Sequence, residues 1–230
     1  MLKISIVIPV YNAASILKFS IEQIDAFFDR QNYDYEILLR DDGSSDHSRA
    51  ILERLAEEHP KVRYSYNRTN AGLGFTLREL FLEACGDVIV YSDCDLPFGV
   101  EGIQEVVTRV KEHDLVVASR YRGAAHSVCF SRKLASRAYY LLCKALFNVP
   151  VIDIGSGLVA IKKEVLERVV LKSMGFEIHV ELFIKAVRAG FNIYEIPMIS
   201  EEAALNTFSI IRHGPKTVLE TIRLKIQLNN

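Results

Sequence analysis

The run Val88-Ile89-Val90-Tyr91-Ser92-Asp93-Cys94-Asp95 indicates what class of fold to expect. A short, β-branched apolar segment without polar alternation is typical of a buried parallel strand. It ends in two carboxylates, and ligands of open α/β sheets bind beyond the carboxyl ends of the strands. Two hard oxygen donors this close suit Mg2+ or Mn2+, which bridge to phosphate oxygens. The alternative for an isolated Asp-x-Asp is a solvated turn or a helix cap.

Two further strand patterns end in the same way. Residues 35–40 lead into Asp41-Asp42-Gly43, where the glycine permits a sharp turn. Residues 4–8 lead into Pro9-Val10-Tyr11-Asn12. Three strands that end in polar or aromatic side chains are expected to converge on one edge of a sheet, and that convergence favours a binding site over coincidence.

Composition narrows the class of protein. The chain has 230 residues, half of them hydrophobic, and its 28 basic and 29 acidic side chains leave a formal net charge of -1. This balance gives no support for nucleic-acid binding, which needs a basic excess. The four cysteines form no Cys-x-x-Cys pair, so reduced thiols in a cytoplasmic protein are the simplest interpretation. We recognise no signal peptide and no transmembrane segment.

Strand and helix patterns alternate along the chain, which predicts an α/β fold with a mostly parallel, Rossmann-like sheet flanked by helices. We expect one domain over residues 1–205, with a nucleotide-binding half (1–95) and an acceptor half (96–205). Residues 206–230 form a basic tail, for which a helix is one interpretation. Strands are expected at 3–9, 35–40, 62–66, 88–92, 115–119, 156–161 and 193–199, and helices at 14–29, 46–59, 72–85, 99–111, 132–147, 163–171 and 177–189.

The ordered motifs of the first hundred residues resemble a known family. Residues 5–12, 41–46 and 70–72, followed by Asp93-Cys94-Asp95, are similar in order and spacing to the family-two glycosyltransferases, which have the glycosyltransferase A fold. Residues 119–121, 153–157, 175–181 and 190–197 resemble the polyprenol-phosphate sugar synthases of that family, the dolichol-phosphate mannose synthase type. The chain departs from those synthases at Ala13, where they usually carry Glu, and at Pro97, where some carry a polar metal ligand.

The resemblance implies a divalent metal on the donor side of the site. Asp95 is expected to bind Mg2+ or Mn2+ directly, and Asp93 to contact the metal through water or the ribose. The metal would stabilise the charge that develops on the departing diphosphate.

The nucleoside is expected to lie against the ends of the first two strands. Carboxylates accept hydrogen bonds from base N–H groups and ribose hydroxyls, and Tyr11 can stack on the base. The alternatives are an Asx-turn made by Asp42, core packing of Tyr11, and helix-start geometry for Gly72. The residues assigned to the nucleotide sugar are Pro9, Tyr11, Asn12, Asp41, Asp42, Gly72 and Asp93.

Arginines and acidic residues from the second half are assigned to the reaction and the acceptor. Arg120 and Arg132 are expected to bind phosphate, because guanidinium forms bidentate hydrogen bonds to it; a solvated basic loop is the alternative. Glu181 is the candidate general base for a hydroxyl acceptor, or else a structural ion-pair partner. Asp153 and Ser156 are expected to shape the acceptor side.

These assignments predict a metal-dependent, inverting glycosyltransferase that moves a sugar from a nucleotide donor to a polyprenyl phosphate. It would act at the cytosolic membrane face. The alternatives are transfer to a saccharide hydroxyl and a non-catalytic nucleotide-sugar-binding subunit that needs a membrane partner. Residues 132–147 are apolar on much of their surface, which core burial or an interfacial position on the membrane would explain.

Overall fold

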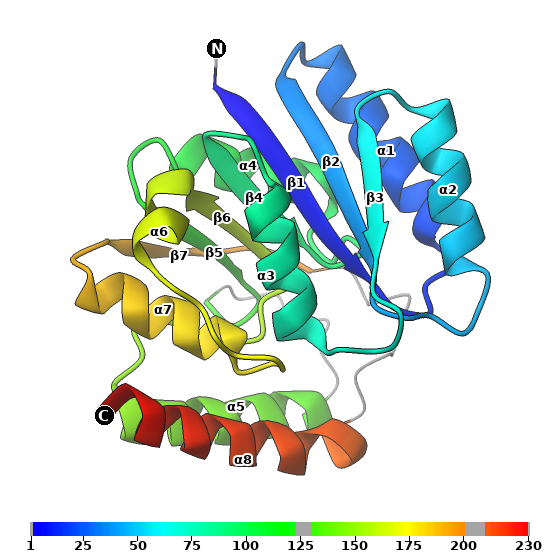
Figure 1. Cartoon of the computed structure of the whole chain (residues 1–230). Coiled ribbons are helices and arrows are strands. Elements are labelled where there is room, and N and C mark those ends of the chain that lie inside the picture. Colours follow the sequence, from blue (N-terminus) through cyan, green and yellow to red (C-terminus); the bar gives the residue numbers. More distant parts are fainter. Residues whose placement is uncertain (1, 123–129, 201–209, 230) are drawn as a thin grey trace.

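The structure is a computed structural model that describes residues 2–122, 130–200 and 210–229. Seven strands form one sheet in the order β3-β2-β1-β4-β6-β5-β7, with helices packed on both faces (Figure 1). The strands are β1 Lys3–Val10, β2 Asp34–Asp41, β3 Val62–Tyr66, β4 Val88–Ser92, β5 Leu115–Ser119, β6 Leu158–Lys162 and β7 Ile193–Pro197. The helices are α1 Leu17–Arg30, α2 Ser48–Glu58, α3 Leu73–Glu83, α4 Gly99–Arg109, α5 Phe130–Phe147, α6 Lys163–Arg168, α7 Ile178–Arg188 and α8 Ile210–Asn229.

The sheet is mostly parallel, as predicted. β6 alone runs antiparallel, to β4 on one side and to β5 on the other, while β5 pairs in parallel with β7. This reversal is not visible in the sequence, because the direction of a buried strand leaves no mark in its residue pattern.

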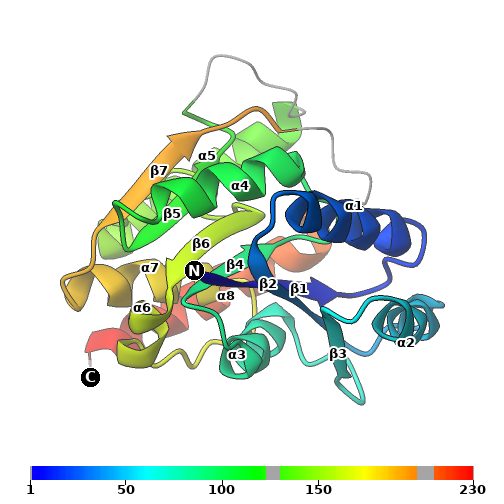
Figure 2. The same ribbon diagram turned by 90° about the horizontal axis from the view of Figure 1, so that it is seen from above.

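Alternation along the strands divides the apolar interior into two layers. In β1, Ile4, Ile6 and Ile8 face the layer that contains residues of α1, α2 and α4, while Val7 faces the layer that contains residues of α3, α6 and α7. Figure 2 shows the sheet from above with α1 and α4 on one side and α3 and α6 on the other. Both faces of the central strands are therefore buried, which explains why β1 and β4 read as continuous apolar runs.

The strand register brings the predicted site residues to one edge. Val10, the last residue of β1, is paired with Asp41, the last residue of β2. Ser92 ends β4 opposite Leu158, which begins β6, and Ser119 ends β5 opposite Pro197. The loops after β1, β2, β4, β5 and β7, and the loop before β6, therefore all leave the same edge of the sheet.

Helices α5 and α8 lie side by side and form a separate layer beyond α7 (Figure 1). The Tyr139 hydroxyl of α5 is hydrogen-bonded to Thr221 Oγ1 of α8 at 2.8 Å. Thr217, Thr221 and Leu224 are buried, which sets one face of α8 against the rest of the protein. Residues 210–229, part of the predicted basic tail, are thus a packed helix.

Helix α3 offers a matched test of the core. Leu80 has none of its surface exposed, whereas Leu82, two residues along the same helix, is 81% exposed. Leu80→Ala should lower the free energy of unfolding by about 2–5 kcal/mol, because it leaves a cavity as well as losing apolar burial. Leu82→Ala should change it by less than about 0.5 kcal/mol. Urea unfolding of both variants measures the difference, and equal effects would contradict the burial of Leu80 in the core.

Candidate active site

The loops that follow β1 and β2 are held together by hydrogen bonds. Asn12 has φ of 50°, in the left-handed region that asparagine tolerates. Its backbone N–H donates to Ser44 Oγ at 2.9 Å, and its side-chain oxygen accepts from the Ser45 N–H at 2.8 Å. The conformation of Asn12 therefore fixes one loop against the other, next to the predicted nucleoside site.

The two adjacent aspartates have different partners. Asp41 accepts a hydrogen bond from the Ser44 N–H at 3.1 Å, so the turn before Gly43 is stabilised by Asp41 and not by Asp42. Asp42 Oδ1 accepts from Asn67 Nδ2 and from the Ala71 N–H, each at 2.8 Å. Both aspartates are buried, at 2% and 5% exposure. They organise the site edge, and their contacts with the nucleoside remain a prediction.

Glycines 72 and 74 are required by contact with protein backbone. A Cβ on Gly72, whose φ is 96°, would lie 2.5 Å from the Met174 carbonyl oxygen, and one on Gly74 would lie 2.6 Å from that of Ser173. The Gly74 N–H donates to the Met174 carbonyl at 2.9 Å, and the Gly72 N–H donates to Asp42 Oδ2 at 3.0 Å. The start of α3 is thereby held between the nucleotide-binding half and residues 173–174.

Tyr11 is 44% exposed at the carboxyl end of β1. Core packing, the alternative for this residue, is therefore not what holds it. An exposed ring beside the Asn12 loop is available for stacking on a base.

Asp93 and Asp95 follow β4 at the same edge, and both are partly exposed. The Asp93 N–H donates to the Gly157 carbonyl at 2.9 Å, which ties the Asp-x-Asp segment to the loop before β6. The buried hydroxyl of Tyr91 donates a hydrogen bond to Asp93 Oδ1. Burial, followed by the charge of Asp93, raises the pKa of Tyr91 well above its ordinary value, so this hydroxyl keeps its proton.

The carboxylates fit a divalent cation that also binds the substrate. Among the described residues, no cluster of three or more His, Cys, Asp and Glu side chains could hold a metal alone. Mg2+ is usually bound by one or two carboxylates together with substrate phosphates and water. Asp93 and Asp95 match that requirement.

Arg120 is held rigidly by Asp153. Its Nε and Nη2 donate to the two carboxylate oxygens of Asp153 at 2.9 and 2.7 Å, and Nη2 also donates to the Gly155 carbonyl at 2.7 Å. Burial alone would lower the pKa of Arg120, but the hydrogen bonds and charge of Asp153 outweigh it and raise the pKa. The guanidinium is thus a fixed positive charge at the end of β5, and Asp93 lies close enough to contribute to its pKa.

Sequence reasoning missed Glu195, which supports this arrangement. Glu195 on β7 is 5% exposed and accepts hydrogen bonds from the Ile152 and Asp153 N–H groups at 3.1 and 2.8 Å. Arg122 completes the cluster with an ion pair to Glu195 at 2.7 Å. The signal available in the sequence was a single glutamate within the short run Ile193-Tyr194-Glu195-Ile196.

Ser156 is buried, and its Oγ donates to the Ala118 carbonyl at 2.6 Å, so its side chain is occupied by backbone contacts. Arg132 lies in α5, but its side chain is outside the part of the chain that the structure describes. Acceptor contacts of Ser156 and Asp153, and phosphate binding by Arg132, remain predictions.

Glu181 forms the ion pair that the sequence offered as the alternative to a general base. Its carboxylate, 1% exposed, accepts from Lys185 Nζ at 2.6 Å and from the Lys172 and Ser173 N–H groups at 2.9 and 2.7 Å. Burial opposes its ionisation, but these donors outweigh burial and hold the pKa of Glu181 below its ordinary value.

Burial lowers the pKa of nearby His179 to about 4, so that imidazole is neutral at pH 7.

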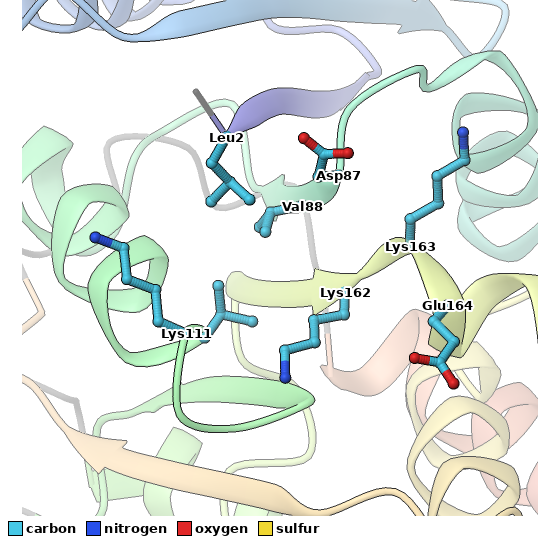
Figure 3. Close-up of a pocket in the computed structure, with 8 residues that line it drawn as sticks. Leu2, Asp87, Val88, Lys111, Lys162, Lys163 and Glu164 are labelled. Atoms are coloured by element: carbon cyan, nitrogen blue, oxygen red, sulfur yellow. The ribbon is translucent and has the colours of Figure 1, made fainter.

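A cavity of about 420 Å³ lies at the opposite edge of the sheet, near the start of β1 and β4 (Figure 3). Its apolar lining includes Leu2 and Val88. The ammonium groups of Lys111, Lys162 and Lys163 point in different directions, and Lys162 is paired with Asp114 at 3.0 Å. The charged groups that line this cavity do not converge on a common point, and the cavity lies away from the predicted site.

A mostly parallel sheet with carboxylates and a fixed arginine at its carboxyl edge agrees with the glycosyltransferase A fold expected from the sequence. The chain belongs to the family described as Glycosyl transferase family 2, whose model matches residues 5–170. This confirms the family suspected from the sequence.

Two curated relatives are similar over most of the chain. A dolichol-phosphate mannosyltransferase of Pyrococcus furiosus is 32% identical to this chain, and the alignment covers 96% of this chain and 62% of the relative. The glycosyltransferase AglD of Haloferax volcanii is 27% identical over 91% of this chain and 35% of its own length. The chain therefore spans less than two thirds of these relatives.

Solved structures share the fold. Glucosyl-3-phosphoglycerate synthase of Mycobacterium tuberculosis, in complex with Mn2+, uridine diphosphate and phosphoglyceric acid, superimposes with a TM-score of 0.73 at 20% identity, covering 97% of this chain and 78% of that one. A mannosyltransferase of Pyrobaculum calidifontis in complex with GDP-Man and Mn2+ superimposes with a TM-score of 0.67 at 18% identity, covering 97% of this chain and 64% of that one.

In the described part of the present chain, no helix is long and apolar enough to cross a membrane.

The ion pair of Glu181 predicts a pH-dependent contribution to stability. Because its folded-state pKa is lowered, the stabilisation is complete above the unfolded pKa of about 4.3 and is lost as the pH falls through the folded value. Glu181→Gln should lower the free energy of unfolding by about 2 kcal/mol at pH 7, and the difference from wild type should shrink below about pH 4.

The control is Glu164→Gln. The side chain of Glu164 is 65% exposed and its pair with Arg168 is 3.6 Å long, so this change should have little effect at either pH. Urea unfolding at several pH values makes the comparison. A difference for Glu181→Gln that stays constant down to pH 3 would show that its charge does not contribute.

Proposed function

We propose that this glycosyltransferase moves a sugar from a nucleotide donor to a polyprenyl phosphate, with inversion at the anomeric carbon and with a divalent cation. The observation that carries the proposal is the meeting of Asp93, Asp95 and Arg120 at one edge of the sheet. Negative groups for a cation and a fixed guanidinium are both needed where two phosphorylated substrates meet. The curated relatives named for dolichol-phosphate and undecaprenyl-phosphate transfer support the class of acceptor.

On the donor side, Asp95 and Asp93 would hold Mg2+ or Mn2+ against the diphosphate. When bound, the cation supplies positive charge that stabilises the nucleoside diphosphate as it leaves. Tyr11, Asn12 and Asp41 lie at the neighbouring strand ends, where the nucleoside would be recognised.

On the acceptor side, a phosphate does not need a general base. Its second ionisation lies near pH 6, so it arrives as an anion and needs orientation rather than proton removal. Arg120, held by Asp153 and indirectly by Glu195, supplies a charge that does not move. The hydrogen bonds of Glu181 to Lys185 and to the backbone leave its carboxylate engaged, which also favours a phosphate acceptor over a hydroxyl.

Asp95→Asn tests the donor site. The change removes a charged metal ligand and should lower kcat/KM for sugar transfer by about a hundredfold or more. Asp34→Asn is the matched control, because Asp34 is exposed at the amino end of β2, on the opposite edge of the sheet, and should leave the rate unchanged. The assay measures transfer from radiolabelled nucleotide sugars to polyprenyl phosphate in the presence of Mn2+.

A panel of saccharide acceptors is run in parallel. Transfer to saccharides and not to polyprenyl phosphate would overturn the proposed acceptor while leaving the donor site intact. Donor binding by calorimetry without turnover on any acceptor would indicate a non-catalytic subunit.

The α5–α8 face, defined here as the exposed apolar and basic residues of those two helices, is the surface that we propose contacts the cytosolic side of the membrane. Its apolar members are Leu134, Leu141, Val218, Leu219, Ile222 and Ile226, all more than a third exposed. The buried side of α8 faces inward, so residues 218, 222 and 226 form an outward stripe at helical spacing.

Charge favours a lipid surface as the occupant of this face. Arg137 and Lys144 of α5 and Lys216 and Arg223 of α8 are exposed. Residues 130–147 contain no acidic side chain, and residues 210–229 contain only Glu220. Apolar residues with neighbouring Lys and Arg are typical of helices that lie in an anionic membrane surface, where a polyprenyl phosphate is also found.

Ile222→Glu should weaken binding to vesicles that contain phosphatidylglycerol by about tenfold, because it places a negative charge on the stripe. Leu82→Glu is the control, since Leu82 is exposed on α3, away from this face. Co-sedimentation with vesicles measures both. Equal binding by the two variants, or no binding by the wild type, would contradict a membrane contact through α5 and α8.

A further inference from the structure

Tyr91 and Asp93 lie on the same side of their segment. Residues two apart on a strand share a face, and the length of a tyrosine brings its hydroxyl to the carboxylate of the residue two positions on. Tyr91 is 2% exposed, and its hydroxyl donates to Asp93 Oδ1. The proposed contacts with the donor and the acceptor do not involve Tyr91.

The ring of Tyr91 is itself held in place. His179, in the first turn of α7, packs against it with ring centroids 5.2 Å apart and an interplanar angle of 34°. Phe183, one turn further along α7, lies 6.5 Å from His179. His179 is 5% exposed and Phe183 is fully buried, so the tyrosine ring packs against a buried part of α7.

The other carboxylate oxygen of Asp93, Oδ2, lies against Gly157. A Cβ added to Gly157 would overlap Asp93 Oδ2, so a side chain at position 157 would displace the Asp93 carboxylate. The backbone hydrogen bond from Asp93 to Gly157 fixes the same approach. The carboxylate is therefore bounded by the Tyr91 hydroxyl at one oxygen and by the Gly157 backbone at the other.

We propose that Tyr91 is a positioning residue, whose hydroxyl holds the Asp93 carboxylate in the orientation that receives the cation and diphosphate of the donor. The inference rests on the proposed function. A carboxylate that is already oriented loses less conformational freedom when the cation binds, and a hydrogen bond to a charged group is stronger than one between neutral groups. Tyr91 acts through Asp93 and does not touch the substrate.

Tyr91→Phe keeps the ring and removes only the hydroxyl. Mn2+ binding is measured by electron paramagnetic resonance, with UDP and then GDP present. We expect the affinity for Mn2+ to fall by about tenfold, from the loss of one hydrogen bond to a charged group. In the transfer assay, the KM for Mn2+ should rise in proportion, while kcat at saturating Mn2+ should change far less.

Tyr35→Phe is the matched control. Tyr35 is also buried, at 4% exposure, and its hydroxyl donates to Asp25 Oδ1 at 2.7 Å, but it lies near the amino end of β2. Both variants should lose similar stability in urea unfolding, whereas only Tyr91→Phe should lose Mn2+ affinity. A Tyr91→Phe protein that loses stability but binds Mn2+ as the wild type does would show a structural role alone and overturn the proposal.

A spectroscopic measurement on protein with the intact hydroxyl covers the case in which Tyr91→Phe does not fold. With 3-fluorotyrosine at position 91, addition of Mg2+ and the nucleoside diphosphate should shift the fluorine resonance, and the same label at position 35 should show no shift. An unchanged resonance at position 91 would overturn the inference. If the wild type binds neither Mn2+ nor Mg2+ with nucleotide, the proposed function fails and this inference fails with it; if it binds and only the Tyr91 results are negative, the proposed function stands.

Discussion

The parallel pairing of β1 with both β2 and β4 is the constraint on which the site depends. Because Val10 is paired with Asp41 and Val7 with Tyr91, the three strands end near the same level, and the loops that leave them start close together. On the other side of β4, the antiparallel β6 brings Gly157 next to Asp93. The residues predicted for the donor and those predicted for the acceptor thus meet at the two sides of β4.

Buried carboxylates hold the loops of this site, each by accepting backbone N–H groups. Asp42 holds residues 71 and 72, Glu181 holds residues 172 and 173, and Glu195 holds residues 152 and 153. Each is also paired with a cationic or amide side chain. Buried charge is stable only when it is hydrogen-bonded in this way. An acidic residue near the site is therefore not by itself a ligand or a base.

The strand ends could be predicted from the sequence because apolar runs that stop at polar residues are local signals. The fold class and the common edge of Asp41, Asp42, Asp93 and Asp95 followed from them, whereas the family followed from the resemblance of the ordered motifs. The partners of those side chains could not be predicted, since they lie far along the chain: Asp42 contacts Ala71, and Arg120 contacts Asp153. The direction of β6 and the contact between Tyr91 and His179 likewise depend on tertiary packing.

The order of the strands has a consequence for how the chain can be divided. β1 to β4 form one side of the sheet and β5 to β7 the other, joined by the ladder between β4 and β6. A fragment that ended after residue 95 would leave β4, all five of whose residues are buried, as an unprotected apolar border. Such an exposed edge strand pairs readily with other chains, so the fragment would aggregate.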